Sequence, residues 1–290
     1  MKSTILEYLK LTKPKIMLLV IFTGSAALVW EGSFLSYPGK FLLVLMGLYL
    51  TGGCANALNQ YFEREIDAKM TRTAGKRPLP TRRLEPKMAL LFSIIIGIIG
   101  IAIFLLFFNW LTALLSLSTI LFYSLFYTLW LKPNTPQNIV IGGIAGAMSP
   151  VGAWTAATGH FDIVPWIMFA IIFLWTPPHF WMLALYYKDD YDKAELPMMP
   201  VIKGEIATLK QIITYTIILF LVSMSLLAFG SGWFYLIVAF ITGVIFIRKV
   251  IKAIQLKSKT YFRSVFGYSI LYLFSLFTGI IIDSFITGVR

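Results

Sequence analysis

Long apolar runs constrain this chain more than any other feature of the sequence. Nine of them recur along it, most close to the roughly 20 residues that a helix needs to cross a bilayer. The strands of a membrane barrel would alternate apolar and polar residues one by one, and these runs do not. We therefore expect an all-α, polytopic membrane protein, a bundle of nine transmembrane helices in contact with the lipid bilayer. The expected spans are Ile16–Trp30, Phe41–Tyr61, Met88–Phe108, Trp110–Leu131, Ile139–Ala157, Pro165–Tyr186, Leu209–Phe229, Trp233–Ile251 and Val265–Ile286.

The composition agrees with a membrane protein of one domain. Hydrophobic residues make up 58% of the 290 residues, against the roughly 45–50% that is usual in soluble domains. No linker, low-complexity segment or obvious repeat divides the chain, so residues 1–290 are expected to form a single transmembrane domain. No small-residue cleavage pattern follows the first run, which we interpret as a retained helix and not a signal peptide.

The distribution of lysine and arginine predicts the orientation in the membrane. Cytoplasmic loops carry an excess of these residues, and an odd number of spans puts the termini on opposite sides. A cytoplasmic N-terminus and an outside C-terminus place all 25 basic residues inside except Lys40 and Arg290. The net charge of +12 then reflects this bias and attraction to anionic lipid. A nucleic-acid partner is not expected, because no basic soluble module is present.

The clustered acidic residues gather in two loops on the predicted cytoplasmic side, after the second and the sixth span. Two acidic clusters on one face of the membrane suggest two halves of one site. The first cluster comprises Glu63, Glu65, Asp67 and Glu85, and the second comprises Asp189, Asp190, Asp192, Glu195 and Glu205.

The first cluster continues a polar stripe that begins inside the second span. Its members are spaced three, four and four residues apart, so a helix places them on one face. An amide inside an apolar run is costly unless it has a partner or lines a cavity. Amide and carboxylate oxygens suit Mg²⁺, which shares its coordination with substrate phosphates. This functional interpretation is favoured over a solvated helix end. The stripe consists of Asn56, Asn59, Glu63 and Asp67.

A basic segment punctuated by proline follows the stripe. The arginines and lysines of residues 69–83 would hold the phosphate oxygens of a polyanion that the metal leaves unpaired. Arg82, Arg83 and Lys87 are better explained as determinants of topology. Lys132, isolated after the fourth span, fits an inside anchor and a ligand of the same anion equally well.

The second acidic cluster closes the sixth span. Asp189 shares a helical face with Asp192 or with Lys193, at spacings of three and four residues. We interpret it as a second candidate metal site, although a charged cap on a membrane helix is common.

Two histidines and one cysteine complete the candidates. His179 follows Pro177 and Pro178 in the sixth span, where such prolines are tolerated if the helix lines a cavity. It is either a substrate contact or a buried imidazole bonded to a neighbouring helix. His160 is expected at the surface, and Cys54 is expected to serve packing only.

These motifs resemble the UbiA superfamily of intramembrane prenyltransferases. The segments that carry the resemblance are NQYFEREIDAKMTRTAGKRPLP from Asn59, YTLWLKPNTPQNIVIGGIAGAMSPVGAW from Tyr127 and WTPPHFWMLALYYKDDYDKAELPMMPV from Trp175. Many members have Asp where this chain has Gln60 and Glu63. This departure and the WTPPHFW segment are similar to the haem-farnesylating branch. The likeness covers the chain through the sixth span, and the last three helices are recognisable only by hydropathy.

The resemblance implies farnesyl diphosphate and protohaem IX as substrates, haem O and diphosphate as products, and Mg²⁺ as cofactor. It implies a catalytic metal site of Asn59, Glu63, Asp67, Asp189 and Asp190. The second acidic segment does not cleanly reproduce the superfamily's pair of acids four residues apart. The diphosphate would contact Arg72, Lys76, Arg77 and Lys132, and the other expected substrate contacts are Asn56, Asp192, Lys193 and His179. The implied location is the cell membrane, with the site facing the cytoplasm and a downstream haem-modifying enzyme as a partner.

Two other functions remain open. A secondary transporter could use the polar residues within the spans, but it would place charges near the bilayer midplane, and here they gather at one face. Another prenyltransferase of the superfamily could act on a quinone precursor or a chlorin.

Overall fold

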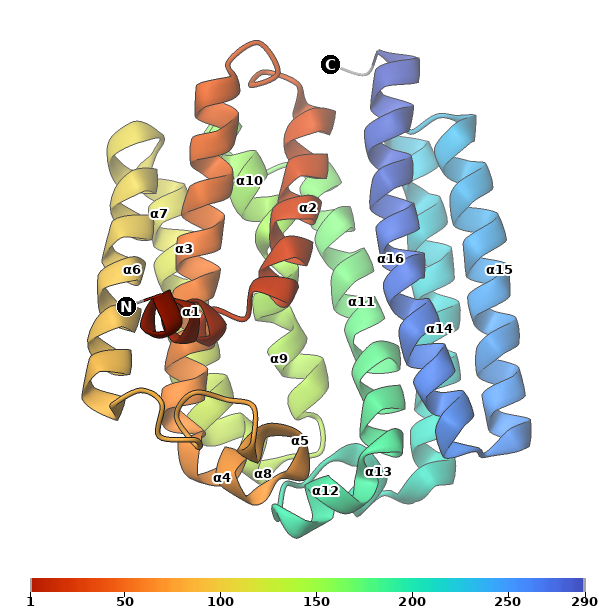
Figure 1. The fold of residues 1–290 in the computed structure, drawn as a ribbon. Coiled ribbons are helices and arrows are strands. Elements are labelled where there is room, and N and C mark those ends of the chain that lie inside the picture. Colours follow the sequence, from red (N-terminus) through yellow and green to blue (C-terminus); the bar gives the residue numbers. More distant parts are fainter. Residues whose placement is uncertain (1, 289–290) are drawn as a thin grey trace.

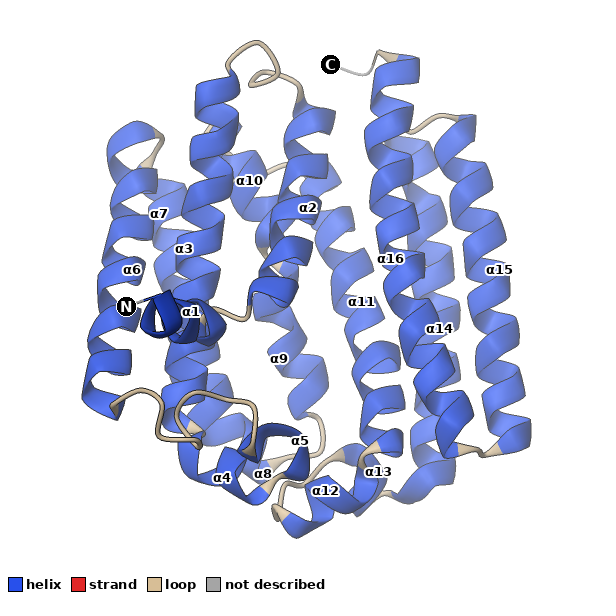
Figure 2. Ribbon diagram, viewed as in Figure 1, coloured by secondary structure: helices blue, strands red, loops and turns tan. Residues whose placement is uncertain are grey.

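The computed structural model describes residues 2–288, which form helices joined by short loops without any strand (Figure 2). Nine helical segments in this range are long and apolar enough to cross a membrane, which confirms the predicted bundle. They are α2 (Pro14–Glu31), α3 (Pro38–Phe62), α6 (Pro86–Phe107), α7 to α8 (Trp110–Asn134), α9 and α10 (Asn138–Thr158), α11 (Ile163–Tyr186), α14 with η2 (Gly204–Phe229), α15 (Trp233–Leu256) and α16 (Lys259–Thr287).

Five short helices lie outside the spans. Helix α1 (Lys2–Leu11) runs across the bundle ahead of α2 (Figure 1). The others follow α3 or α11 and lie together at one end of the bundle, at the bottom of Figure 1. They are α4 (Arg64–Lys69), α5 (Thr71–Ala74), α12 (Lys188–Lys193) and α13 (Met199–Ile202). We call this end, with the loops after α3, α8 and α11, the polar end.

The end of α16 lies opposite the polar end (Figure 1). Which end faces the cytoplasm stays a prediction, and Arg290, assigned above to the outer side, lies outside the described residues. The outermost helices expose large apolar side chains such as Leu106 and Trp233, as expected of a surface in contact with lipid. Helix α11 and the α9–α10 span are the most enclosed, with 67% of their spanning residues buried against 28% in α6, α14 and α15.

Two spans depart from regular α-helix. The fifth divides at Met148 into α9 (Asn138–Ala147) and α10 (Ser149–Thr158), because Pro150 cannot donate the backbone hydrogen bond that would continue α9. The fourth begins as α7 (Trp110–Leu121), continues as the π-helical η1 (Phe122–Leu131) and ends in α8 (Lys132–Asn134).

The last two spans are longer than hydropathy predicts. Helix α16 begins at Lys259 and not at Val265, and α15 continues beyond Ile251 to Leu256. The added turns carry lysines and Arg263, so a hydropathy window excludes them although the helical backbone continues.

Candidate active site

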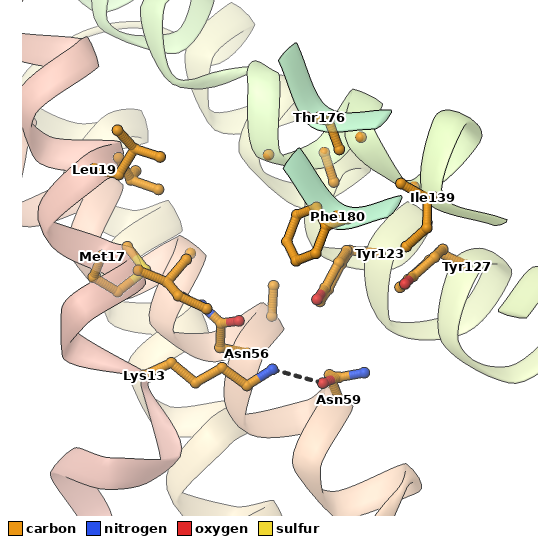
Figure 3. A pocket seen from close by; sticks show the side chains of 18 of the residues that line it. Lys13, Met17, Leu19, Asn56, Asn59, Tyr123, Tyr127, Ile139, Thr176 and Phe180 are labelled. Atoms are coloured by element: carbon orange, nitrogen blue, oxygen red, sulfur yellow. Dashed lines mark hydrogen bonds between the residues drawn. The ribbon is translucent and has the colours of Figure 1, made fainter. Parts of the chain in front are cut away.

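A cavity of about 550 Å³ runs inside the bundle between α2, α3, η1, α9, α11 and α16. At its polar end it is lined by charged residues from α3, α4 and the loops that follow, among them Glu63 and Asp67. Farther in, the lining becomes apolar and aromatic. Figure 3 shows Tyr123, Tyr127 and Phe180 on the wall opposite Met17 and Leu19.

The polar stripe predicted from the sequence lines this cavity. Asn59 lies in the last turn of α3, Glu63 occupies the junction between α3 and α4, and Asp67 lies on α4. The Asp67 amide donates to the Glu63 carbonyl over 2.8 Å, so the helical repeat carries the stripe across the junction. All three residues are buried, with exposed fractions of 2–3%. Their oxygens therefore face the cavity and not bulk water.

Three cations from distant segments enclose the stripe. Lys132, at the start of α8, forms an ion pair with Glu63 Oε1. Arg77, in the loop after α5, forms an ion pair with Asp67 and lies 3.8 Å from Glu63 Oε2. Lys13, just before α2, donates to Asn59 Oδ1 over 2.8 Å (Figure 3). Of the predicted cations, Arg77 and Lys132 thus contact the stripe directly.

The charged groups shift one another's pKa values. Burial alone would raise the pKa of Glu63, but Lys132, Lys13 and Arg77 outweigh it and lower that pKa. Burial outweighs Arg77 at Asp67 and raises its pKa. Burial and Arg77 lower the pKa of Lys13 to about 7. The surrounding cations thus favour the carboxylate form of Glu63, whereas burial disfavours the charged forms of Asp67 and Lys13.

The donor set at the stripe fits a magnesium ion. It offers an amide oxygen and two carboxylates that are buried beside a cavity, and Mg²⁺ takes one or two carboxylates when substrate phosphates complete its coordination. Between residues 2 and 288 there is no group of three or more His, Cys, Asp or Glu side chains that could hold a metal by themselves. A magnesium ion here would complete its coordination with water and substrate phosphates.

The two amides beside Asn59 point in different directions. Asn56 lines the cavity and donates to Met17 Sδ over 3.4 Å. Gln60 faces away from the cavity and donates to the carbonyls of Lys10 and Leu11, over 3.1 and 2.9 Å. The Lys10 carbonyl also accepts from the Lys13 amide over 3.2 Å, so Gln60 matters most to the Leu11 carbonyl at the C-terminus of α1. Gln60, one of the two residues that replace the superfamily's usual Asp, thus makes a structural contact.

The second acidic segment only partly joins this site. Asp190 Oδ2 accepts from the Arg72 amide over 3.1 Å, which links α12 to α5. Asp189 is largely exposed and pairs with Lys259 over 2.7 Å. That hydrogen bond and charge lower the pKa of Asp189. Asp189, Asp190 and Lys76 line a smaller open hollow beside the cavity, and Arg72 borders both.

Asp192 and Lys193 lie farther out on α12. Both are exposed, and neither lines the cavity or the adjoining hollow. The grouping predicted for the second half-site is therefore looser in space than the grouping predicted for the first.

His179 lines the apolar part of the cavity. Its ring is stacked between Trp175 and Phe266, with centroid distances of 4.1 and 4.4 Å. Its Nδ1 lies 2.7 Å from Ser269 Oγ on α16. The expected bond to a neighbouring helix is present, and the imidazole also borders the cavity, while a contact with substrate stays a prediction.

The sequence profile of the UbiA prenyltransferase family matches residues 17–276. This chain belongs to the UbiA prenyltransferase family. It is 46% identical to a protoheme IX farnesyltransferase of Picosynechococcus sp., over 97% of this chain and 90% of that protein. A structure of a digeranylgeranylglyceryl phosphate synthase superimposes with a TM-score of 0.79 at 20% identity, over 97% of this chain and 99% of that one.

A UbiA homologue from Archaeoglobus fulgidus, solved bound to DMAPP and Mg²⁺, superimposes with a TM-score of 0.61. Its identity is 16%, and the match covers 94% of this chain and 99% of that one. At such identities the two structures show that this prenyltransferase has the UbiA fold.

Sequence reasoning missed three residues that line the cavity of this UbiA prenyltransferase. Lys13 precedes the first predicted span, and its only signal in the sequence is that it is a basic residue on the same predicted side as the acidic loops. Tyr123 and Tyr127 looked like ordinary apolar residues of the fourth span. The π-helix turns both toward the cavity, and Thr128 Oγ1 donates to the Tyr123 carbonyl five residues back, over 2.7 Å. Segments of π-helix are rare and frequent at functional sites.

Proposed function

We propose that this UbiA prenyltransferase transfers the farnesyl group of farnesyl diphosphate to a vinyl group of protohaem IX, giving haem O and diphosphate. The observation that carries the proposal is the cavity, which joins a buried carboxylate pair among three cations to an apolar, aromatic chamber. The choice of acceptor is supported by the similarity to protoheme IX farnesyltransferases.

The charged end suits the departure of diphosphate. Breaking the allylic C–O bond leaves additional negative charge on the diphosphate, and cations fixed in advance stabilise that charge where it develops. Lys13, Arg77 and Lys132 are held near one another by the stripe. We assign them to the diphosphate, with Arg72 at the border of the cavity. Lys76, predicted for the same role, lines the outer hollow and stays a prediction.

Asn59, Glu63 and Asp67 would hold a magnesium ion at this end. The ion supplies positive charge that neutralises phosphate oxygens and weakens the bond to the leaving group. The prediction that Asp189 and Asp190 hold a second ion stays a prediction, and it requires Asp189 to exchange Lys259 for the metal. Asp192 and Lys193 likewise stay predicted substrate contacts.

The apolar end suits the two organic groups. An allylic cation survives only where water is excluded until the vinyl carbon attacks it. Tyr127, Phe180 and Trp175 supply an apolar, electron-rich lining. Ser269 occupies Nδ1 of His179, so Nε2 is the atom left to contact the porphyrin or its iron. Asn56, which lines the passage between the two ends, would contact the substrate near the diphosphate.

The bundle is proposed to lie in the cell membrane with its polar end in the cytoplasm. This orientation puts the site on the side where soluble diphosphates are made, and the lysine and arginine bias supports it. An enzyme that further modifies haem O stays a predicted partner.

The proposal is tested by incubating the purified protein in detergent with haem B, farnesyl diphosphate and Mg²⁺. Mass spectrometry should detect the farnesyl-hydroxyethyl adduct, and chelation of the metal should abolish it. Product from a quinone precursor or a chlorin, with none from haem, would instead support the alternative acceptors. If the protein instead moves a solute across the membrane and forms no prenylated product, the alternative function as a secondary transporter would be supported.

A further inference from the structure

One cation that lines the cavity has no assigned role. Five basic side chains line it, namely Lys13, Lys15, Arg72, Arg77 and Lys132. Lys13, Arg77 and Lys132 bond to the polar stripe. The Arg72 guanidinium lies over the rings of Tyr187 and Tyr191, 6.0 and 5.7 Å from their centroids. Within residues 2–288, Lys15 forms neither an ion pair nor a side-chain hydrogen bond.

Lys15 lines the cavity and lies along the chain between Lys13 and the apolar lining residues of α2. It lies in the first turn of α2, two residues after Lys13, and is exposed. The cavity wall continues from it along α2 through Ile16 and Leu19. Helix α16 lies beside α2 (Figure 1) and contributes Phe266 and Phe274 to the same cavity, and Phe274 stacks on Phe22 at 4.8 Å. An unpaired ammonium thus stands at the rim of an aromatic chamber.

The proposed acceptor needs a cation at such a place. Protohaem IX is a flat apolar ring with two vinyl groups and two propionate carboxylates. Contact with the aromatic residues of the cavity stabilises the bound ring. A carboxylate that enters a low-dielectric cavity without a partner is, in contrast, strongly disfavoured. The cations around the stripe are bonded to Asn59, Glu63 and Asp67. In the proposed function these cations bind the diphosphate of the donor.

We propose that Lys15 binds a propionate carboxylate of the porphyrin acceptor. This inference rests on the proposed function and adds to it the group that anchors the polar edge of the acceptor. Lys15 then acts on acceptor affinity and not on ionisation of the prenyl donor. Its charge sets the depth at which the ring stops, with the carboxylate at the rim and the vinyl edge farther inside.

The test compares protohaem IX with its dimethyl ester, which has the same ring and vinyl groups but no carboxylate. The KM of each acceptor and of farnesyl diphosphate is measured for the unaltered protein and for Lys15→Gln, Lys15→Arg and Lys87→Gln. Lys87 is an exposed lysine at the start of α6 that does not line the cavity, so its variant is a matched control for loss of charge.

We expect Lys15→Gln to raise the KM for protohaem IX about tenfold, the size of one charge-assisted hydrogen bond. The KM values for the ester and for farnesyl diphosphate should stay unchanged. Lys15→Arg should restore most of the affinity for protohaem IX, and Lys87→Gln should behave like the unaltered protein.

Three results would overturn the inference. An unchanged KM for protohaem IX in Lys15→Gln would show that the charge is not used. An equal rise for both acceptors would assign Lys15 to folding or to a lipid phosphate, and a rise for farnesyl diphosphate would assign it to the donor. If the unaltered protein prenylates neither porphyrin, the proposed function itself has failed and this inference falls with it.

Discussion

Glu63 is the side chain on which the charged end of the cavity depends most. It is 3% exposed and its carboxylate faces Lys132 and Arg77 together. Replacing Glu63 by Gln keeps the shape but removes the charge that holds these cations and that would contribute to a magnesium site. We expect Glu63→Gln to lower kcat by about 100-fold or more, the usual loss when an electrostatic stabiliser is removed. Steady-state turnover measures it.

Glu65→Gln is the matched control for that variant. Glu65 lies two residues farther on α4, but its side chain is 84% exposed and pairs only with its neighbour Arg64. We expect this variant to keep the turnover of the unaltered protein. Full activity in Glu63→Gln would remove the basis for a metal site at the stripe.

Lys13 is expected to act on the prenyl donor. Its ammonium reaches Asn59 from the segment before α2, and burial and Arg77 lower its pKa to about 7. An arriving diphosphate would pair with this ammonium and favour its charged form. Lys13→Gln should therefore raise the KM for farnesyl diphosphate by about tenfold.

The matched control is Lys10→Gln, three residues earlier on α1. Lys10 forms an ion pair with Glu7 and does not line the cavity, so its loss should leave that KM unchanged. An equal effect of both variants would show that only the net charge of the N-terminal segment matters.

At the scale of elements, α1 is held in place by a side chain from α3. Gln60 donates to two carbonyls at the C-terminus of α1, and Lys13 follows only two residues after Leu11. Gln60→Leu would leave the Leu11 carbonyl unpaired at a cost of about 1–3 kcal/mol, while the Lys10 carbonyl keeps its bond from the Lys13 amide. Faster amide exchange in residues 4–13 and a several-fold higher KM for farnesyl diphosphate are expected.

Gln255→Leu provides the control, because Gln255 is an exposed residue near the end of α15. If Gln60→Leu leaves amide exchange in α1 as slow as in this control, the side chain does not fasten the helix.

The packing of η1 against α9 depends on a glycine. A methyl group at Gly142 would overlap the ring of Tyr127, whereas one at Gly146, a turn later, would meet no atom within 4 Å. Gly142→Ala should therefore destabilise the fold by about 1–3 kcal/mol through overpacking, and Gly146→Ala should be tolerated. The midpoint of thermal unfolding in detergent compares the two variants. Equal midpoints would mean that η1 shifts at no cost.

At the scale of the whole molecule, the orientation in the membrane can be tested by cysteine labelling. Cys54 is buried, so a Cys54→Ser background removes the one native thiol. The exposed loop between α2 and α3, which contains Ser33, lies opposite the polar end, and α4, whose last residue is Lys69, lies at the polar end (Figure 1). In intact cells, a membrane-impermeant maleimide should label Ser33→Cys, and should label Lys69→Cys only after permeabilisation. The reverse pattern would invert the predicted topology.

Much of this protein could be read from local sequence patterns. The nine spans follow from hydropathy, because a bilayer sets the length of an apolar helix for any chain. The polar stripe was predictable because residues three or four apart share a face of one helix, so the spacing of Asn59, Glu63 and Asp67 needs no knowledge of other segments. The boundaries were least predictable where charged turns extend α15 and α16.

The partners of those residues were decided by tertiary structure alone. Lys13 and Lys132 reach the stripe from 46 and 69 residues away, and nothing local specifies either approach. The two acidic loops lie at one end of the bundle, as expected. However, α12 packs near α16, so Asp189 forms an ion pair with Lys259 and does not line the cavity. The sequence by itself determined the spans and the face of the helix that bears the acids, because both depend on helical geometry. Which cations meet those acids, and which polar residues stay outside, was decided by how the helices pack.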